Sequence, residues 1–226
     1  MTPCLRLALL ALLAAACSSD PTFTPVRVTG VAYGVTFSPR GFTTTMTTDD
    51  VAAFLRDKEA GPAIAFHMNW RDSIARAGEI PDTAIFANNE SQTYGFLPIV
   101  GFGFNGSAGP ALTSESDRTD NSWTNNETRT EFLAMVREYA RRYRPQYLFL
   151  GNEINSYYLT ATQPQWEAWV TMFREAYLAV KAESPATVVF TVFQYEHLKG
   201  LGVKNGWADD DQWELLDDFA GTVDAL

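Results

Sequence analysis

Short apolar runs alternate with helical segments along most of this chain, and this alternation constrains the fold more than any other feature. Each run is apolar over nearly its whole length, as expected of a strand that is buried on both faces in a parallel sheet. The stretches between the runs show helical spacing of apolar residues. The alternation predicts an α/β fold. The predicted strands are 28–37, 63–70, 97–104, 146–151 and 186–195, and the predicted helices are 48–58, 127–142, 164–180 and 211–219.

Two architectures fit this pattern, an open doubly wound sheet and a (β/α)8 barrel. The stretch GFGFNGSAG at 101–109 resembles a phosphate-binding loop, but no helix follows promptly and the stretch contains no Lys. Barrel enzymes build their sites at the carboxyl ends of the strands, and this chain concentrates polar and aromatic residues at those points. We therefore predict the barrel. The strand-end residues are His67, Asn69, Trp70, Phe104, Asn105, Asn152, Glu153, Gln194, Tyr195 and Glu196.

The predicted TIM barrel is incomplete. The sequence supplies five strands and, at 222–226, the first residues of a sixth. A complete barrel domain takes about 250 residues, which is more than the 226 residues of the whole chain. We expect residues 27–226 to form a partial barrel of about five to six β/α units, as in a truncated gene product or a fragment.

The N-terminus has the features of an export signal. Arg6 precedes an apolar run at 7–16, which ends in three Ala residues directly before Cys17. This run is too short for a stable membrane span. A Cys after small residues resembles the lipobox of bacterial lipoproteins, in which the Cys is acylated and becomes the mature N-terminus. The resemblance implies a signal peptide at 1–16, a tether at 17–26 and a lipid anchor on Cys17 in the bacterial cell envelope, facing the periplasm or the exterior. The alternative is an ordinary secreted protein that is cleaved nearby.

Composition excludes several other classes of function. The formal net charge of −10 and the pI of about 4.6 disfavour nucleic acid as a partner. The two cysteines, Cys4 and Cys17, both belong to the signal or its end, so no disulfide framework or thiol site is predicted in the mature fold. With two His and no thiol cluster, no zinc site is predicted, and no cofactor motif is present.

The segment LFLGNEIN, 148–155, places a carboxylate directly after a buried strand. Cleavage of a glycosidic bond needs a carboxylic acid to protonate the leaving oxygen and a second carboxylate at the anomeric carbon. The acid must hold its proton until it reacts, which favours partly apolar surroundings, and Glu153 lies between an apolar strand and Tyr157. The alternative is a surface Glu that closes a turn.

This segment resembles the retaining glycoside hydrolases of the large (β/α)8 clan A, whose fourth strand ends in Asn-Glu. The GNEI form, 151–154, is particularly similar to the endo-β-1,4-galactanase branch. The resemblance implies that Glu153 is the general acid/base and that Asn152 holds the sugar 2-hydroxyl. It also places the nucleophile, another Glu, at the end of a seventh strand. Glu196, after the fifth strand, either replaces that nucleophile or shapes a sugar-binding site beside Gln194 and Tyr195, and we favour the second role.

Aromatic and polar strand-end residues complete the predicted carbohydrate site. Aromatic rings stack on the apolar faces of sugars, so Trp70 and Tyr157 are candidate binding platforms. His67 lies in a predicted strand, where it is either a ligand-binding donor that faces the barrel interior or a buried structural His. Together with these residues, the resemblance to clan A implies a retaining hydrolase of β-glycosidic bonds in poly- or oligosaccharides. The alternative is a non-catalytic glycan-binding envelope lipoprotein on a degenerate or truncated barrel.

Overall fold

The computed structural model describes residues 23–39, 45–57, 61–70, 78–104, 122–201 and 210–225. The predicted signal at 1–16, Cys17 and the strand-end residue Asn105 lie outside these ranges, and so do residues 18–22 of the predicted tether. Within the described part of the chain, no helix combines the length and the apolar character that crossing a membrane requires.

A parallel sheet of five strands forms the centre of the molecule, and its strands follow one another in the order of the sequence. Every neighbouring pair is parallel. A doubly wound sheet would instead reverse its strand order at a switch point. The sequential order therefore identifies an arc of a barrel. The strands are β1 (Gly34–Thr36), β2 (Ala63–Asn69), β3 (Leu97–Gly103), β4 (Tyr147–Leu150) and β5 (Val188–Phe190).

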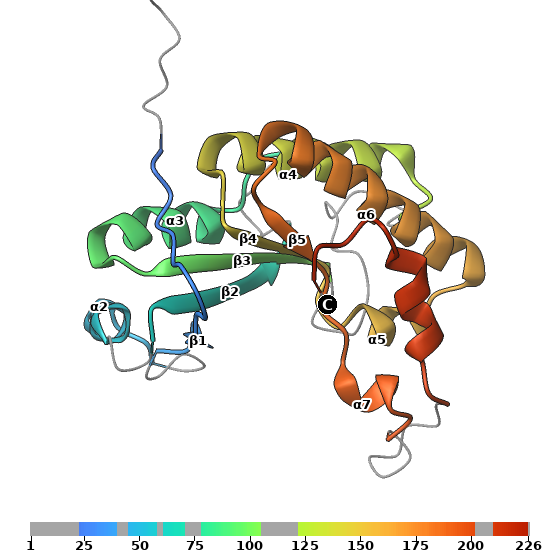
Figure 1. The fold of residues 1–226 in the computed structure, drawn as a ribbon, viewed down its shortest axis with the longest axis horizontal. Helices are drawn as coiled ribbons and strands as arrows, with labels where there is room; N and C mark the ends of the chain where they lie inside the picture. The colour runs from blue at the N-terminus through green and yellow to red at the C-terminus, as the bar shows by residue number, and fades with distance from the viewer. Residues whose placement is uncertain are drawn as a thin grey trace, which may run out of the picture.

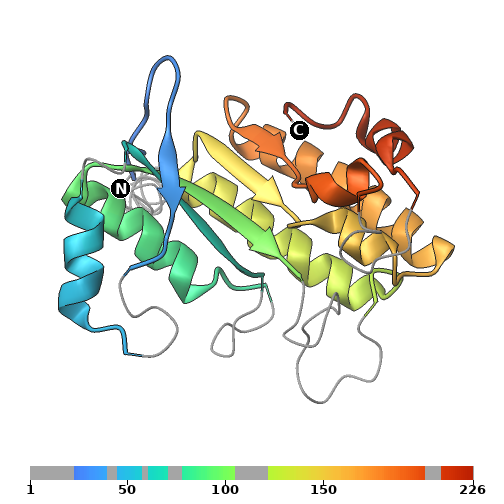
Figure 2. The ribbon, with the colours of Figure 1, turned by 90° about the horizontal axis from the view of Figure 1, so that it is seen from below.

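The long helices cover the convex side of this arc (Figures 1 and 2). Their positions between successive strands confirm the predicted β/α alternation. Two short helices, α5 and α7, and a 3-10 helix, η2, follow the later strands. The helices are α2 (Thr48–Arg56), α3 (Asp82–Tyr94), α4 (Asn126–Tyr143), α5 (Ile154–Tyr158), α6 (Gln163–Glu183), α7 (Tyr195–Leu198) and η2 (Trp213–Phe219).

The core lies between the convex side of the sheet and helices α4 and α6. Phe102 and Leu148 of the sheet and Phe132 and Trp169 of the helices are fully buried there. Trp123 contacts both helix residues, with ring centroids 5.2 Å from Phe132 and 5.0 Å from Trp169. Such aromatic pairs contribute about 0.5–1.5 kcal/mol each beyond the burial of their apolar area, so this cluster stabilises the arc beneath the ends of its strands.

Local sequence signals determine where the long helices begin. The Asn125 side chain accepts hydrogen bonds from the backbone of Glu127 and Thr128, which caps α4. At the start of α6, the backbone N–H of Thr162 donates to the Gln165 side chain (2.8 Å) in a capping box. These bonds satisfy amide groups that a helix N-terminus leaves without partners.

The first predicted strand, 28–37, is much shorter in the structure, where β1 spans Gly34–Thr36. Its upstream part bonds to a side chain instead of a strand. The Val28 N–H donates to Gln146 Oε1, and Gln146 Nε2 donates to the Val28 carbonyl, both at 2.9 Å. Phe23 packs edge-on against Tyr143 at 5.0 Å. The segment from Phe23 to Val28 therefore lies across the end of α4 and the start of β4.

The fifth predicted strand, 186–195, is also too long, because β5 ends at Phe190. Beyond that point the backbone bonds to the segment that follows β4. The Ile154 N–H donates to the Val192 carbonyl (3.0 Å), and the Gln194 N–H donates to the Asn155 side chain (2.7 Å). A change of hydrogen-bonding partner thus ends the strand, although the β-branched sequence continues.

Two further differences concern helices. Helix α3, which the sequence pattern did not predict, buries Ala84, Ala87, Asn88 and Ser91, so it has no stripe of large apolar residues that a periodicity search would detect. The predicted helix at 211–219 is instead the 3-10 helix Trp213–Phe219.

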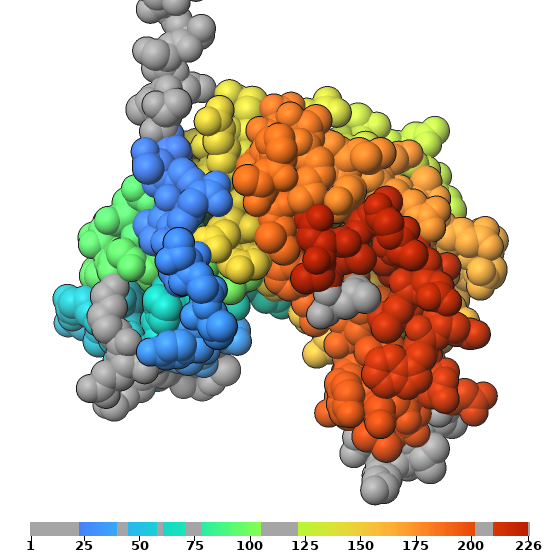
Figure 3. Space-filling view, viewed as in Figure 1, coloured from blue at the N-terminus to red at the C-terminus, as the bar shows by residue number. Residues whose placement is uncertain are grey.

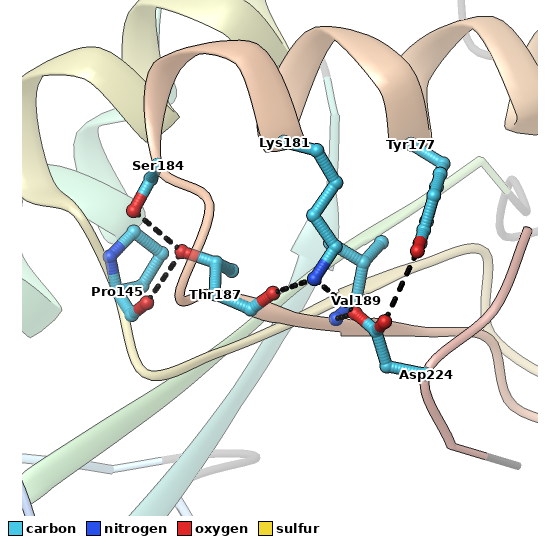
Figure 4. Close-up of polar contacts among 7 residues, drawn as sticks. All are labelled: Pro145, Tyr177, Lys181, Ser184, Thr187, Val189 and Asp224. Carbon is cyan, nitrogen blue, oxygen red and sulfur yellow. Dashed lines mark hydrogen bonds and ion pairs between the residues drawn. The ribbon is translucent and has the colours of Figure 1, made fainter.

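The last described residues join the edge of the sheet through a single bridge, at the place where the sequence predicted the first residues of a sixth strand. Ala225 forms a parallel bridge with Phe190, and the Asp224 N–H donates to the Val189 carbonyl (2.9 Å). The Asp224 carboxylate accepts a hydrogen bond from the Val189 N–H (2.8 Å) and pairs with Lys181 Nζ at 2.5 Å (Figure 4). Tyr177 donates to the same carboxylate (3.1 Å). Helix α6 and β5 together therefore hold Asp224 and Ala225 against the edge of the sheet.

The same close-up shows how the entry to β5 is fixed. Thr187 Oγ1 lies 2.6 Å from the Pro145 carbonyl and 2.8 Å from the Ser184 hydroxyl (Figure 4). Lys181 Nζ donates to the Thr187 carbonyl at 2.5 Å. The end of α6 is thus tied to Thr187, the residue before β5, and Thr187 is tied to Pro145, two residues before β4.

Replacement of Asp224 by Ala should make the stability of the protein less sensitive to acid. Burial by itself would raise the pKa of the Asp224 carboxyl, but the hydrogen bonds from Lys181, Val189 and Tyr177 outweigh it and hold the pKa below its ordinary value. A lowered folded-state pKa stabilises the fold above the unfolded-state pKa, and this contribution disappears as the pH falls through the folded-state value.

Urea unfolding of wild type and Asp224→Ala from pH 7 to pH 2 measures this effect. We expect a difference of about 1–3 kcal/mol at pH 7, which shrinks as the pH falls below about 4. A difference that stays constant or grows on acidification would show that the charge of Asp224 does not stabilise the fold.

Candidate active site

On the concave face of the sheet, side chains of β2, β4 and β5 lie in one row, and the glycines of β3 leave space for them. His67, Gly101, Phe149 and Phe190 are matched across β2, β3, β4 and β5 and point to the same face. A Cβ at Gly101 would collide with the Phe149 ring, and a Cβ at Gly103 would collide with His67 Nε2. Because both positions are glycines, the His67 and Phe149 rings approach each other over β3, with centroids 6.1 Å apart at an interplanar angle of 26°.

His67 therefore faces the barrel interior, which is one of the two positions considered for it. Its side chain is exposed on the concave face. The atoms packed around the ring still desolvate it enough to lower the pKa of His67 below its ordinary value. Near neutral pH the imidazole is accordingly neutral, with one nitrogen that donates and one that accepts a hydrogen bond.

An apolar cavity of about 680 Å³ lies on the same side of the sheet. Figure 3 shows the molecule hollowed between the N-terminal segment before β1 and the C-terminal segments. Val31 and Ala32 before β1, Tyr147 of β4, Phe190 of β5 and Trp213 of η2 are among the residues that line the cavity. A ligand pocket of this volume and apolar character accommodates a small organic molecule or a few sugar rings.

Glu153 follows β4 directly and has an unusual backbone conformation. Its φ is 50° and its ψ is 47°, in the left-handed region that non-glycine residues rarely adopt. The side chain is exposed at the carboxyl end of the strand, at the start of α5. This exposure corrects the expectation of partly apolar surroundings, because Glu153 is exposed whereas Ile154 and Tyr157, which follow it, are buried.

Neighbouring residues hold Glu153 in this conformation. Gly151 precedes it with φ at +78°, and a Cβ on Gly151 would meet Ile154, Trp169 and Phe104. Ile154 is fully buried, and its N–H donates to the Val192 carbonyl. The turn is therefore fixed on both sides of Glu153, and strained backbone of this kind persists only where its surroundings determine it.

Replacement of Glu153 by Gly should stabilise the fold, because Gly adopts the left-handed region without a steric penalty. Arg144, the C-cap of α4, is the matched control, with φ at 43° in the same region. We expect both Glu153→Gly and Arg144→Gly to raise the free energy of unfolding by about 1 kcal/mol, as measured by thermal and urea unfolding. If only Arg144→Gly stabilises the protein, the Glu153 side chain itself makes interactions that offset the strain.

The segment after β5 bonds to the segment that carries Glu153. Gln194 is the N-cap of α7, and its Oε1 accepts a hydrogen bond from Ser156 Oγ (3.1 Å). Tyr195 and Glu196 follow, both exposed, with Tyr195 at 56%. The fold thus connects the predicted residues Gln194, Tyr195 and Glu196 to the Glu153 turn, although about 40 residues separate them in the chain.

Two predicted sugar-binding residues lie inside the core. Trp70 is 2% exposed, and its ring contacts Trp123 (6.5 Å) and Phe132 (5.6 Å) beneath the helices. Tyr157 is 5% exposed, packs edge-on against Phe104 at 5.2 Å, and has its pKa raised to about 12 by burial. The expectation that these rings are sugar platforms does not fit their positions, because each faces the helical layer.

The remaining predicted residue, Asn152, is half-buried between Gly151 and Glu153.

Among the described residues, no group of three or more His, Cys, Asp or Glu side chains is arranged to hold a metal ion. Sequence reasoning missed Asn155, which is fully buried and bonds to Gln194 and Gln212. The sequence feature that could have identified Asn155 is its position two residues after Glu153 in the NEIN segment.

This geometry permits proton transfer to or from a bound ligand. An exposed carboxyl group on a fixed turn at the carboxyl end of a barrel strand is within reach of solvent and of a ligand that lies across the strand ends. Glu196, on the bonded neighbouring segment, is a second carboxyl group on the same side of the fold.

Solved structures match this fold, whereas no protein-family model and no curated protein matches the sequence. The exo-beta-1,4-mannosidase Op5Man5 from Opitutaceae bacterium strain TAV5 aligns with a TM-score of 0.57 and 14% identity, over 80% of this chain and 35% of that chain. GH5_18 from Streptomyces cattleya, in complex with GlcNAc, aligns with a TM-score of 0.52 and 16% identity, over 74% of this chain and 45% of that chain. This chain thus matches less than half the length of these neighbours. The comparison establishes the fold: five parallel strands and their helices form a partial (β/α) barrel like that of glycoside hydrolases.

Proposed function

We propose that the protein is a glycoside hydrolase that cleaves β-glycosidic bonds with retention, with Glu153 as the general acid/base. The observation that carries the proposal is the position of Glu153, exposed after the fourth strand of a partial barrel on a left-handed turn fixed by Gly151 and Ile154. A residue held in a strained conformation at the carboxyl end of a barrel strand indicates a functional role. The NEIN segment and the glycoside hydrolase fold support the same assignment.

In this mechanism Glu153 performs two proton transfers. Its protonated carboxyl group donates to the glycosidic oxygen as the bond to the anomeric carbon breaks, and the resulting carboxylate later takes a proton from the attacking water. Asn152, beside it, holds the sugar 2-hydroxyl. His67 contributes a neutral donor and acceptor on the concave face, and Gln194, Tyr195 and Glu196 contact the sugar from the segment after β5.

The second carboxylate acts as the nucleophile, and in retaining enzymes its carboxyl group lies about 5–5.5 Å from the acid. The resemblance to clan A assigns this role to a Glu at the end of a seventh strand, beyond the described arc. Glu196 is accordingly assigned to sugar binding.

The stereochemistry of the product tests this function directly. Aryl β-glycosides, β-1,4-mannan and β-1,4-galactan are incubated with the protein, and proton NMR follows the first anomer that forms. The mannosidase neighbour and the galactanase-like GNEI segment are the reasons for the two polysaccharides. Release of the β-anomer first supports the proposal, whereas release of the α-anomer would contradict retention.

A non-catalytic glycan-binding role is the second candidate. The exposed aromatic side chains of Tyr195 (56%) and Trp213 (44%), which both line the apolar cavity, favour it, since rings at a cavity rim can stack on sugars without any chemistry. Glycan binding by the wild-type protein without release of a reducing end from any of these substrates would select this role over hydrolysis.

We also propose that Cys17 carries a lipid that anchors the protein in the bacterial cell envelope. The charged start, the short apolar run at 7–16 and the small residues before Cys17 support this assignment. Mass spectrometry of the N-terminal peptide from a membrane fraction should show an acylated Cys17. A soluble wild-type protein with an unmodified Cys17 would contradict the anchor.

A further inference from the structure

A buried amide connects three segments at the candidate site. Asn155, the second residue of α5, is 0% exposed. Its Nδ2 donates to the Gln194 carbonyl (2.9 Å) and to Gln212 Oε1 (3.0 Å), and its Oδ1 accepts from the Gln194 N–H (2.7 Å). Both amide protons and the carbonyl oxygen of the side chain are therefore used.

The backbone of Gln194 determines the orientation of this amide. One residue offers both its N–H and its carbonyl to the same side chain, so the oxygen of Asn155 must face the N–H and the nitrogen must face the carbonyl. The Asn155 side chain thereby gives Gln194 the two backbone hydrogen bonds that a residue of a neighbouring strand would otherwise make. It does so beyond the point where β5 stops pairing with β4. An aliphatic side chain of similar size would remove the acceptor of the Gln194 N–H and the donor to Gln212 Oε1, and a buried polar group that loses its partner costs about 1–3 kcal/mol. The Gln194 carbonyl would keep the hydrogen bond from the Leu198 N–H (3.2 Å).

The segments that Asn155 connects are those that carry the exposed carboxyl groups. Glu153 lies two residues before Asn155, and Glu196 lies two residues after Gln194. Gln212, which is 5% exposed, joins the segment before η2 to the same amide, and its own N–H donates to the Leu198 carbonyl at the end of α7 (3.2 Å). Movement of Asn155 would therefore shift both carboxyl-bearing segments relative to each other.

We propose that Asn155 is a positioning residue that fixes the Glu153 turn and the Gln194–Glu196 segment relative to each other and so sets the geometry of the carbohydrate site. This inference rests on the proposed function for its effect on catalysis. Asn155 itself touches no substrate, because it is fully buried. Its action is to hold the acid/base and the sugar-contacting segment in one arrangement, and a displacement of about 1 Å in such an arrangement costs about 100-fold in rate.

Asn88 provides a matched control within the same chain. It is 1% exposed, and its Nδ2 also makes two hydrogen bonds, to the Ala84 carbonyl (2.8 Å) and to the Tyr139 hydroxyl (2.9 Å). It lies on α3, in the helical layer on the convex side of the sheet. Asn88→Ala therefore removes a comparable buried amide without touching the segments of the site.

The test compares Asn155→Ala, Asn155→Asp and Asn88→Ala with the wild-type protein, well below their unfolding temperatures. Hydrogen exchange is measured on peptides that cover 153–158 and 193–198, and turnover is measured on an aryl β-glycoside. We expect both Asn155 variants to raise amide exchange in these two peptides about tenfold or more. Asn155→Asp should show the same rise in exchange as Asn155→Ala, because its carboxylate would face the Gln194 carbonyl and could not donate a hydrogen bond to it.

In the same variants we expect kcat to fall about 10–100-fold, with a smaller change in KM. Asn88→Ala should lower the unfolding temperature but leave both peptides and kcat at their wild-type values. The inference is overturned if exchange in both peptides stays at the wild-type level in Asn155→Ala, or if kcat falls equally in Asn88→Ala. A wild-type protein without turnover would refute the proposed function, and the exchange comparison would still decide whether Asn155 fixes the two segments.

Discussion

Glu153→Gln should abolish most hydrolysis while glycan binding stays close to wild type. The amide has nearly the same shape as the carboxylic acid but cannot give a proton to the leaving oxygen, and general acid catalysis contributes about 10²–10⁴-fold to the rate. The loss should be largest for natural glycans. It should be smaller for aryl glycosides whose phenol leaves without a proton, because these substrates need the acid less.

Steady-state kinetics on a series of aryl β-glycosides, with calorimetry for glycan affinity, measure both parts of this result. Glu196→Gln is the matched control, since Glu196 is an exposed carboxyl group on the neighbouring segment. We expect it to weaken binding more than turnover, in line with a sugar-contacting role. Wild-type turnover in Glu153→Gln would remove Glu153 from the mechanism.

Gly151→Ala should destabilise the fold by about 2–5 kcal/mol, the sum of a left-handed backbone penalty and overpacking of the core. The φ of Gly151 is +78°, and an added Cβ would meet Ile154 Cγ2, with Trp169 Cζ2 at 2.8 Å and Phe104 Cε1 at 3.3 Å. These neighbours are buried parts of the aromatic core, so they have little room to shift. The Glu153 turn should be displaced as the contact is relieved.

Gly221→Ala separates the two contributions. Gly221 has the same φ of +78°, but among the described residues, its two chain neighbours aside, no atom lies within 4 Å of the position that its Cβ would occupy. Urea unfolding should therefore show a loss of about 1–2 kcal/mol for Gly221→Ala, from the backbone alone, and a clearly larger loss for Gly151→Ala. Equal losses would mean that crowding against Ile154 and Trp169 has no role.

Much of the architecture follows from local sequence patterns. The apolar runs at 63–70, 97–104 and 146–151 became β2, β3 and β4, and every boundary lies within one residue of its predicted position. Helix α6 begins one residue before the predicted Pro164, because Thr162 and Gln165 form a capping box. These features are predictable since burial periodicity, proline and capping residues act within a few residues of the chain.

The errors occur where a distant segment replaces a local partner. The predicted first strand is shortened because Val28 bonds to the Gln146 side chain, and the fifth because Gln194 bonds to Asn155. Each of these contacts spans 39 residues or more. No window of sequence contains both partners, so the pattern of β-branched residues continues past the point where pairing stops.

The candidate site shows the same division. The position of Glu153 after the fourth strand was predictable from the Asn-Glu pair that follows an apolar run. The same reasoning placed Gln194 and Glu196 at the end of the fifth strand, whereas they lie beyond its end at Phe190, at the start of α7. The rings of Trp70 and Tyr157 were misplaced, because strand-end aromatic residues can face either the barrel mouth or the helical layer. That choice is decided by packing against Trp123 and Phe104.

The sequence by itself determined the β/α alternation, the parallel sheet and the place of Glu153 after its fourth strand, because each depends on short-range periodicity or on adjacent residues. Only the tertiary structure decided that Glu153 lies exposed on a left-handed turn and that the glycines of β3 bring His67 and Phe149 together. It also decided that a buried Asn155 couples the two carboxyl-bearing segments. These features depend on steric fit and hydrogen bonds between segments that are distant in the chain and meet only when the sheet curves into its arc.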